Sequence, residues 1–590
     1  MILPNVNEIH TSRDMIDTFG GYNHNLRIGS GEFYDMENLS STHYPLLSPR
    51  PKRGTFAPEA GEAAINPQGL IAKDSLGYVD GRYFVLNEYR IDLGLSTDEK
   101  DCPKTLISTG AYVIILPDKK WINTADMTEH GNIEATYTSL TTNSVSFELC
   151  TIDGAAYTNT QISATEPANP LDKDYWIDTS STPHTLKQYS ATSSMWVSVA
   201  TTYIKITSPG IGLPFEQYDG VTISGIKHAS LSDLNSTMVI WEKGDNYIVV
   251  IGMLDGTIVQ QGSEGVITVK RQMPVMDFVT ESENRLWGCH YGVAANGEIV
   301  NEIYASKLGD FKNWNCFMGI STDSYAATVG TDGQFTAAVT HLGYPLFFKE
   351  TCVHKVFGSF PAAYQIQTTN CRGVAKGSEK SLATVNEVLY YKSRNGVCAY
   401  DGSLPIEVSS ALGEVTYSDA VGGCLGNKYY ISMKDTAGVY HLFVYDTVRG
   451  MWHREDNTQV KEFCNCRGEL YYIDTKSQIK TILGSGAKDT GSIKWMAETG
   501  IIGTSMPDKK YISRLLVRMS LEIGAKVMFF IQYDSMGEFE HLFTMTGSTL
   551  NSFTVPIKPS RCDHFRLRIE GIGDAKIYSI TKTIEQGSDV

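Results

Sequence analysis

Short apolar runs bounded by Gly, Asn or Asp recur along this chain from about residue 66 onward. Within them, apolar residues alternate with polar ones or form brief continuous stretches, which is typical of β-strands. Representative runs are 81–85, 112–116, 246–251, 284–287, 344–348, 386–391, 427–432 and 468–472. No long amphipathic helical pattern interrupts the series, which disfavours α/β architectures. The pattern therefore predicts an all-β protein.

A longer period organises these strands. A turn followed by a strand rich in Leu and aromatic residues recurs at intervals of 40 to 60 residues, at Leu286, Leu346, Leu389, Tyr429 and Leu470. A period of this length built from short strands is typical of a β-propeller, in which each repeat forms one blade. We therefore predict a propeller over residues 66–130 and 231–494, with about six blades. Trp314 is expected to pack between blades.

Residues 131–230 interrupt this rhythm with a stretch rich in Thr, Ser and Asn. Strand-like runs resume after it, so we predict a small β module inserted at an exposed loop of the propeller. Three aromatic residues, Trp176, Tyr189 and Trp196, lie close together in its sequence. They could form a platform on which a glycan stacks, or the miniature core of the module. The core interpretation is favoured, because a small module needs large side chains to bury enough surface.

Residues 495–590 change character, because their strands are longer and alternate cleanly. In 565–569 the apolar residues share one face, while Arg566 and Arg568 lie on the other. The alternation predicts a β-sandwich-like region at the C-terminal end. The predicted order is thus an extended strap over 1–65, the propeller with its insert, and this sandwich.

The N-terminal strap contains the most distinctive motifs. Glycines permit tight turns and prolines enforce an extended path. The motifs are Phe19-Gly-Gly-Tyr22, Leu26-Arg-Ile-Gly-Ser-Gly-Glu32, Asp35-Met-Glu-Asn-Leu39 and Leu46-Leu-Ser-Pro-Arg-Pro-Lys-Arg-Gly54. This series resembles the opening of podophage tail-nozzle and tail-stabilisation proteins, where it precedes a β-propeller. The run Tyr304-Ala-Ser-Lys-Leu-Gly-Asp310, followed by Asn313-Trp314, is also similar to a motif of those propellers.

The resemblance implies a virion structural protein: the nozzle ring of a short phage tail, which forms and gates the DNA conduit. It implies a homohexamer that contacts the portal adaptor and other tail proteins, assembled in the host cytoplasm and located in the virion tail. Double-stranded DNA would pass without tight binding. The cations of the strap could pair with carboxylates across an interface. We therefore predict that the strap contacts a neighbouring subunit or adaptor rather than its own core, through Arg27, Glu32, Asn38, Arg50, Lys52 and Arg53.

The charge balance fits a conduit better than a protein that grips nucleic acid. The 590 residues include 66 acidic and 50 basic side chains, a net charge of −16. Proteins that hold DNA neutralise phosphates with Lys and Arg, whereas a wall along which DNA slides should repel them. A negative net charge is equally explained by the need for solubility. No apolar run is long enough for a transmembrane helix, and the first residues lack a signal-peptide pattern.

The sequence contains none of the common catalytic or nucleotide-binding motifs. Its 11 cysteines lack zinc-site spacing, so we expect no metal site. Because the catalytic and nucleotide-binding motifs are missing, we expect no cofactor, no catalytic residue and no enzymatic activity. The densest polar cluster, His453-Arg-Glu-Asp456, reads as the end of a propeller strand. Two alternatives stay open: a propeller lectin or glycan hydrolase that recognises a host-surface glycan, and a collar or head-decorating protein.

Overall fold

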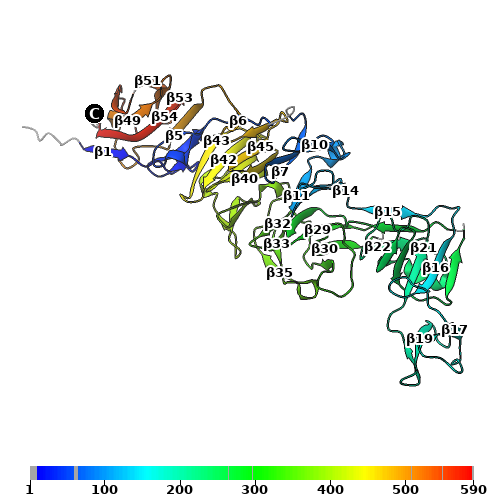
Figure 1. The fold of residues 1–590 in the computed structure, drawn as a ribbon. Helices are drawn as coiled ribbons and strands as arrows, with labels where there is room; N and C mark the ends of the chain where they lie inside the picture. The colour runs from blue at the N-terminus through cyan, green and yellow to red at the C-terminus, as the bar shows by residue number, and fades with distance from the viewer. Residues whose placement is uncertain are drawn as a thin grey trace, which may run out of the picture. The chain divides into compact units, whose positions relative to one another are not determined.

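The computed structural model describes residues 10–58, 64–262, 265–294, 297–506, 508–547 and 549–587 (Figure 1). Strands hold 51% of the residues and helices only 4%. Every described helix is a short 3-10 turn: η1 (Ser41–His43), η2 (Glu99–Asp101), η3 (Ala229–Leu234), η4 (Pro361–Ala363), η5 (Glu379–Ser381) and η6 (Ser410–Leu412). None of these described helices is long and apolar enough to span a membrane. The all-β prediction is confirmed.

The chain forms two compact units. Unit 1 comprises Met1–Lys104, Phe348–Val353 and Thr369–Val590, and unit 2 comprises Thr105–Phe347 and His354–Thr368. Antiparallel four-stranded meanders, the blades of the predicted propeller, occur in both. Within the described residues six sheets contain such a four-stranded blade and a seventh contains a blade of three consecutive strands, which makes one more blade than the sequence period suggested.

The blades of unit 1 are built from consecutive strands. They are β7 (Pro67–Ala72), β8 (Leu76–Asp80), β9 (Tyr83–Leu86) and β10 (Tyr89–Asp92); β36 (Ala383–Val385), β37 (Val388–Lys392), β38 (Val397–Tyr400) and β39 (Ile406–Glu407); β40 (Tyr417–Leu425), β41 (Lys428–Asp435), β42 (Tyr440–Asp446) and β43 (Met451–Asp456); and β44 (Glu462–Cys466), β45 (Glu469–Ile473) and β46 (Ile479–Thr481). Their first strands lie side by side in the order β36, β40, β44, β7, as expected of a propeller.

The other blades follow the same plan. They are β11 (Thr105–Thr109), β12 (Tyr112–Leu116), β13 (Lys120–Asn123) and β14 (His130–Asn132); β28 (Phe278–Ser282), β29 (Arg285–Val293), β30 (Ile299–Ala305) and β31 (Tyr325–Thr328); and β32 (Ala337–His341), β33 (Tyr344–Lys349), β34 (Cys352–Phe357) and β35 (Gln365–Asn370). Trp314 is buried against Ile107 and Ile114 of one blade and Leu286 of the next. Its predicted position between blades is therefore confirmed.

The inserted domain is larger than the sequence suggested. One sheet contains β15 (Ala135–Thr138), β27 (Thr268–Arg271), β22 (Gly220–Ser224) and β23 (Thr237–Val239). A second contains β24 (Glu242–Gly244), β25 (Tyr247–Ile251), β21 (Tyr203–Thr207), β16 (Val145–Cys150) and β26 (Ile258–Gln261). The boundary at residue 230 is wrong, because β26 pairs with β16 and β27 pairs with β15. These two sheets share one apolar core.

A smaller module is nested inside this domain between β16 and β21. Its sheet contains β17 (Thr160–Ser163), β18 (Tyr175–Asp178), β19 (Thr185–Ser190) and β20 (Met195–Ser198). Ile177 and Leu186 extend from one face of it into the core of the larger domain. The module therefore depends on that core for part of its burial.

The predicted sandwich is confirmed at the C-terminal end, and it recruits N-terminal strands. One of its sheets contains β1 (Thr11–Ile16), β54 (Ala575–Gln586), β49 (Lys510–Leu521) and β52 (Asn551–Val555). The facing strands are β3 (Glu32–Glu37), β48 (Lys494–Thr499), β53 (Phe565–Ile572), β50 (Lys526–Tyr533) and β51 (Glu540–Thr546). Side chains from both layers fill one core, in which Val517, Phe529 and Ile577 are buried.

The N-terminal strands join the blade β40–β43 to this sandwich. β2 (Gly21–Tyr22) pairs with β43 and with β3, and β3 pairs with β48, so ten strands form one continuous sheet. β4 (Leu39–Ser40) pairs with β5 (Ser48–Pro49), and β6 (Gly54–Thr55) pairs with β46 and with β47 (Ala487–Lys488). Figure 1 shows the blue N-terminal strands beside yellow and orange ones.

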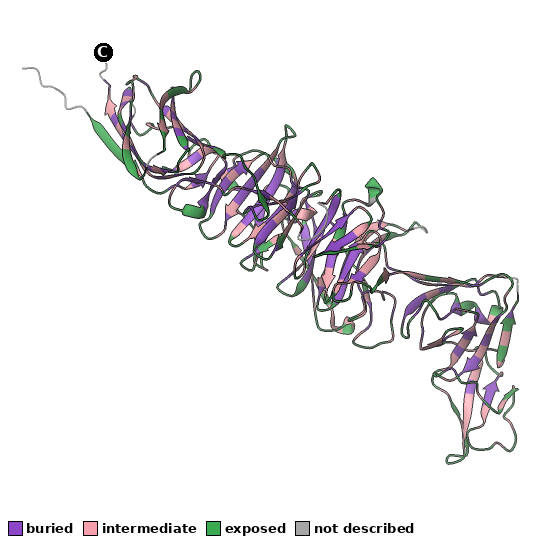
Figure 2. Ribbon diagram, turned by 45° about the horizontal axis from the view of Figure 1, so that its top comes forward, coloured by how far each residue is buried: buried purple, intermediate pink, exposed green. Residues whose placement is uncertain are grey.

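The N-terminal segment is therefore part of the protein's own core. Six of its large side chains are at most 5% exposed: Phe19, Tyr22, Phe33, Met36, Leu39 and Leu47. The prediction that it contacts a neighbour instead of its own core is wrong for these residues, because they supply apolar surface that both blade and sandwich require. Of the described strands in this segment, only β1 is largely exposed, and Figure 2 shows it in green.

Candidate functional site

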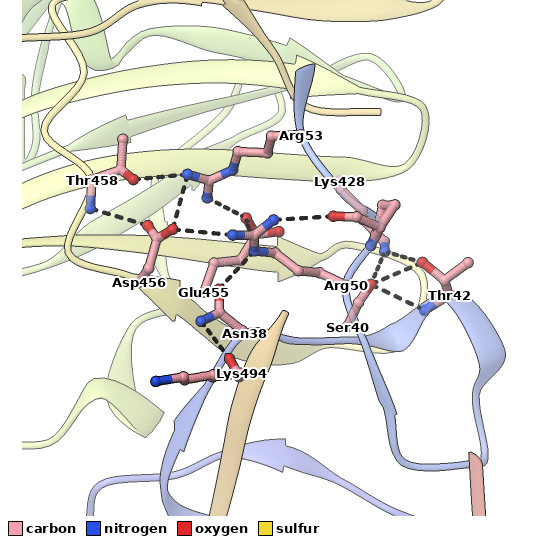
Figure 3. A network of polar contacts seen from close by, with 11 residues as sticks. Asn38, Ser40, Thr42, Arg50, Arg53, Lys428, Glu455, Asp456, Thr458 and Lys494 are labelled. Carbon is pink, nitrogen blue, oxygen red and sulfur yellow. Dashed lines mark hydrogen bonds and ion pairs between the residues drawn. The ribbon is translucent and has the colours of Figure 1, made fainter. Parts of the chain in front are cut away.

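Two arginines of the N-terminal segment meet two carboxylates at the end of β43 (Figure 3). Arg53 Nη2 lies 2.7 Å from Glu455 Oε2, and Arg53 Nη1 lies 2.9 Å from Asp456 Oδ2. Arg50 approaches the same carboxylates at 3.7 and 3.4 Å. We call these four residues together with Asn38 the Arg53 cluster. It fastens the N-terminal segment to the propeller strand.

The Arg53 cluster is buried, which makes its pairing obligatory. The side chains of Arg53 and Glu455 are 6% and 5% exposed. Burial alone raises the pKa of Asp456, but the charges of Arg53 and Arg50 outweigh it and hold that pKa below its usual range. Burial likewise opposes the charge on Arg53, yet Asp456, Tyr472 and Glu455 raise its pKa overall. An unpaired charge at this depth costs several kcal/mol.

Asn38 joins three segments within the cluster. It adopts a positive φ of 56°, a conformation that Asn tolerates better than most residues. Its side-chain amide donates to the carbonyl oxygen of Lys494 over 2.9 Å, and its Oδ1 accepts from Arg50 Nε over 2.7 Å. Its backbone N–H donates to the carbonyl oxygen of Glu455. Propeller strand, sandwich strand and N-terminal segment therefore all meet at one residue.

We expect Asn38→Ala to destabilise the protein by about 2–4 kcal/mol, since it removes side-chain hydrogen bonds and strains the backbone. Asn38→Gly is the matched control, because glycine adopts this φ freely and loses only the hydrogen bonds. Urea unfolding should therefore rank the alanine variant below the glycine variant by about 1 kcal/mol. Equal stability of the two would contradict a role for the backbone conformation.

The glycines of the N-terminal motifs have steric roles. Gly21 has a φ of 85°, and a Cβ there would lie 2.5 Å from the carbonyl oxygen of Trp452. Gly31 has a φ of 92°, and a Cβ there would lie 2.3 Å from the carbonyl oxygen of Thr18. Both positions exclude any side chain. Gly21 therefore lets the N-terminal segment approach the propeller strand β43, and Gly31 lets this segment fold back on its own residue Thr18.

His453, next to the cluster on β43, is buried and uncharged. Burial lowers its pKa from 6.5 to about 3, and the nearby cations Lys428 and Arg449 act in the same direction, against Asp446. Since the folded-state pKa lies below the unfolded one, the unfolded chain takes up this proton first as the pH falls. The contribution of His453 to stability is therefore complete above pH 6.5 and is lost progressively between pH 6.5 and about 3.

We expect His453 to lower the free energy of unfolding by up to about 1.4 kcal/mol for each pH unit as the pH falls below 6.5. Replacing it by a non-titrating residue in His453→Gln should flatten the curve between pH 6.5 and 4.5. Denaturant unfolding at half-unit pH steps measures the slope. An unchanged slope in the variant would show that other groups control the acid sensitivity.

The structure brings some of the predicted interface residues together and separates others. Asn38, Arg50 and Arg53 share the Arg53 cluster, where their partners belong to the same chain. Glu32 Oε2 instead closes its own loop by accepting from Gly29 N and Asn23 Nδ2. Arg27 is exposed and Lys52 is partly exposed. A contact of Asn38, Arg50 and Arg53 with another subunit in place of their own chain is thus a wrong prediction, since the ion pairs of both arginines and the hydrogen bonds of Asn38 are made to residues of the same chain.

Glu455 and Asp456 are the residues that sequence reasoning missed as partners. They lie in the polar cluster 453–456 that was noted only as a strand end. No local signal connects them with arginines some 400 positions earlier in the chain. The sequence offers only a general argument: an arginine that is buried needs a carboxylate partner.

The three aromatic residues of the nested module lie together on one face of its sheet. Trp176 and Trp196 have ring centroids 5.6 Å apart, and Tyr189 and Trp196 are 5.4 Å apart, both edge to face. Lys187 Nζ lies 4.7 Å from the Trp176 ring centroid. Trp176 is 5% exposed and donates from Nε1 to the carbonyl oxygen of Ser163. The rings thus contact each other on the face opposite Ile177 and Leu186.

Among the described residues, no group of three or more His, Cys, Asp or Glu side chains is arranged to hold a metal ion. No family model matches the chain, and no curated protein matches it. Among solved structures it is similar to an exo-β-1,3-galactanase from Phanerochaete chrysosporium, with a TM-score of 0.21, 8% identity and coverage of 52% of this chain and 94% of that chain. It is also similar to PorZ, a type-IX secretion component of Porphyromonas gingivalis, with a TM-score of 0.26, 12% identity and coverage of 82% and 70%. Likenesses this low assign no function.

Proposed function

We propose that this chain is a virion structural protein, the subunit of a nozzle ring at the end of a short phage tail. The observation that carries the proposal is the role of the N-terminal motifs that resemble podophage nozzle proteins. Gly21, Gly31 and Asn38 shape the backbone there, and Arg50 and Arg53 fasten it to the propeller. Motif residues with structural rather than catalytic tasks support an assembly protein without enzymatic activity.

In this proposal six copies surround the DNA conduit and gate it. The ring sits in the virion tail and contacts the portal adaptor and other tail proteins, after assembly in the host cytoplasm. Double-stranded DNA passes without tight binding, since a net charge of −16 per copy opposes adhesion of phosphate.

Light scattering coupled to gel filtration, with negative-stain images, tests the proposal. Six subunits of 65.1 kDa should give a ring of about 390 kDa with an axial opening. A protein that stays monomeric up to the highest soluble concentration would overturn it. Detection of the chain by mass spectrometry in purified tailed particles is the second expected result.

A second candidate is a propeller lectin for a host-surface glycan. The observation in its favour is the aromatic face of the nested module, where Trp196 packs edge to face against Trp176 and Tyr189. Aromatic faces of this kind can stack sugars. Glycan-array binding that disappears in Trp196→Ala but persists in Met195→Ala, an exposed neighbour, would favour the lectin.

A further inference from the structure

The loop between β2 and β3, residues 23–31, is held in place by hydrogen bonds, and we call it the finger. Glu32 Oε2 closes it by accepting from Gly29 N at 2.6 Å and from Asn23 Nδ2 at 2.8 Å. Asn25 Nδ2 donates to the carbonyl oxygen of Ser410 over 2.9 Å, and His24 N donates to that of Ala411 over 2.8 Å. On its other side Ile28 lies over Gly500, whose missing side chain leaves the space.

This fixed loop presents an apolar and a cationic side chain to solvent. Leu26 is 91% exposed, and Arg27 beside it is also exposed. Single exposed leucines are common on protein surfaces. Here, however, several hydrogen bonds fix the loop in the conformation that exposes Leu26 and the neighbouring guanidinium of Arg27. Among the described residues no hydrogen bond or ion pair engages the Arg27 guanidinium, so this cation and the exposed Leu26 beside it are available to another surface.

Unit 2 carries a pocket of about 460 Å³ with matching chemistry, which we call the Phe317 pocket. Its rim is apolar, with Phe317, Ile320 and Phe360 between 40% and 53% exposed. Asp323 lines it with a carboxylate that is 4% exposed. Its Oδ2 accepts from the backbone N–H groups of residues 318–320, while Oδ1 has no hydrogen-bond partner among the described residues.

The negative charge of this pocket is not neutralised by a direct ion pair. Arg285 lies nearby, but its Nη atoms donate to the backbone carbonyls of Ser306, Ser321 and Asp323 rather than to the carboxylate. The Phe317 pocket therefore combines exposed apolar side chains with the negative charge of a buried carboxylate, whose Oδ1 is itself covered. A ligand that carries an apolar side chain beside a cation fits both features.

We infer that the occupant is a second copy of this chain, whose finger places Leu26 in the Phe317 pocket with Arg27 on the side of Asp323. The finger belongs to unit 1 and the pocket to unit 2, so the contact joins two different surfaces. Such a heterologous contact builds rings or open filaments, whereas an isologous contact stops at a dimer. The expectation of a ring rests on the proposed function, and the contact between finger and pocket is the one that would build this ring.

Two variants test this contact, each altering an exposed side chain. Leu26→Asp disables the finger, Phe317→Asp disables the pocket, and Leu404→Asp, at a leucine 59% exposed elsewhere, is the control. Both test variants should raise the concentration at which the protein assembles by roughly tenfold or more, while the control assembles like the wild type. Circular dichroism and thermal melting verify that each variant is folded.

Mixing the two test variants is the decisive step. The mixture contains one intact finger and one intact pocket, so it should yield two-copy particles of about 130 kDa, twice 65.1 kDa, and nothing larger. Rings that persist in both variants would overturn the contact and leave the ring proposal standing. Variants that stay monomeric in the mixture would overturn it in favour of another partner. A monomeric wild type would overturn both the ring and its contact.

Discussion

Replacing Arg53 by methionine is expected to lower the free energy of unfolding by about 3–5 kcal/mol, because it leaves Glu455 and Asp456 buried with only the more distant Arg50 as counter-charge. Methionine keeps much of the volume and the apolar stem, so the loss reflects charge more than packing. Chemical denaturation at neutral pH with an unchanged m-value measures it.

Two comparisons make this prediction specific. Arg82 pairs with Asp92 at 2.9 Å with both side chains about half exposed, so Arg82→Met should change stability little. Adding Glu455→Gln to the Arg53 variant removes one orphaned charge and should restore part of the loss. A double variant that is less stable than the sum of its parts would contradict an electrostatic origin.

Removing the chain up to Thr55 is expected to abolish cooperative folding of unit 1. The truncation removes six large side chains from the core, each worth about 1.5–3 kcal/mol, which together equal or exceed the whole stability of a typical domain. It also takes β2 and β3 out of the ten-stranded sheet and β6 from between β46 and β47. Limited proteolysis and calorimetry should show an unfolded or molten product.

A shorter truncation serves as the control. Removing the chain only up to Ile16 deletes β1, whose first five residues are exposed, and should leave the main transition nearly intact. Adding a peptide of residues 17–58 to the longer truncation should restore protease resistance. A longer truncation that melts like the wild type would show that the blade and the sandwich are stable without these strands.

Local pattern identified many strands, because alternation and flanking turns are properties of a few neighbouring residues. The run 112–116 coincides with β12, and the run 565–569 lies within β53. The strand β6 consists only of Gly54 and Thr55, so it is too short to show any alternation of apolar and polar residues. The extent of the insertion was misjudged for the same reason, since β26 and β27 look like any other strands and only their partners place them.

The sequence identified the cations of the candidate site but not their carboxylate partners. Arg50 and Arg53 stood out as cations in an acidic chain, but the assumption that their carboxylate partners lie on another molecule was wrong. Pairing over such a separation along the chain has no local signature. For Arg27 the same prediction stays open, because its exposure on the finger leaves it available to a neighbour.

Because the N-terminal segment pairs with strands far along the chain, its pairing is delayed during synthesis. Residues 21–55 emerge from the ribosome early, but their strand partners lie between 451 and 499. At about 5–20 residues per second the segment waits roughly 20–90 s before its partners exist. During that interval unit 1 lacks the strands that complete its sheets, and the nascent chain must keep exposed strand edges from pairing wrongly. Its glycines and prolines suit this delay, since they discourage premature β-structure until the last blade arrives.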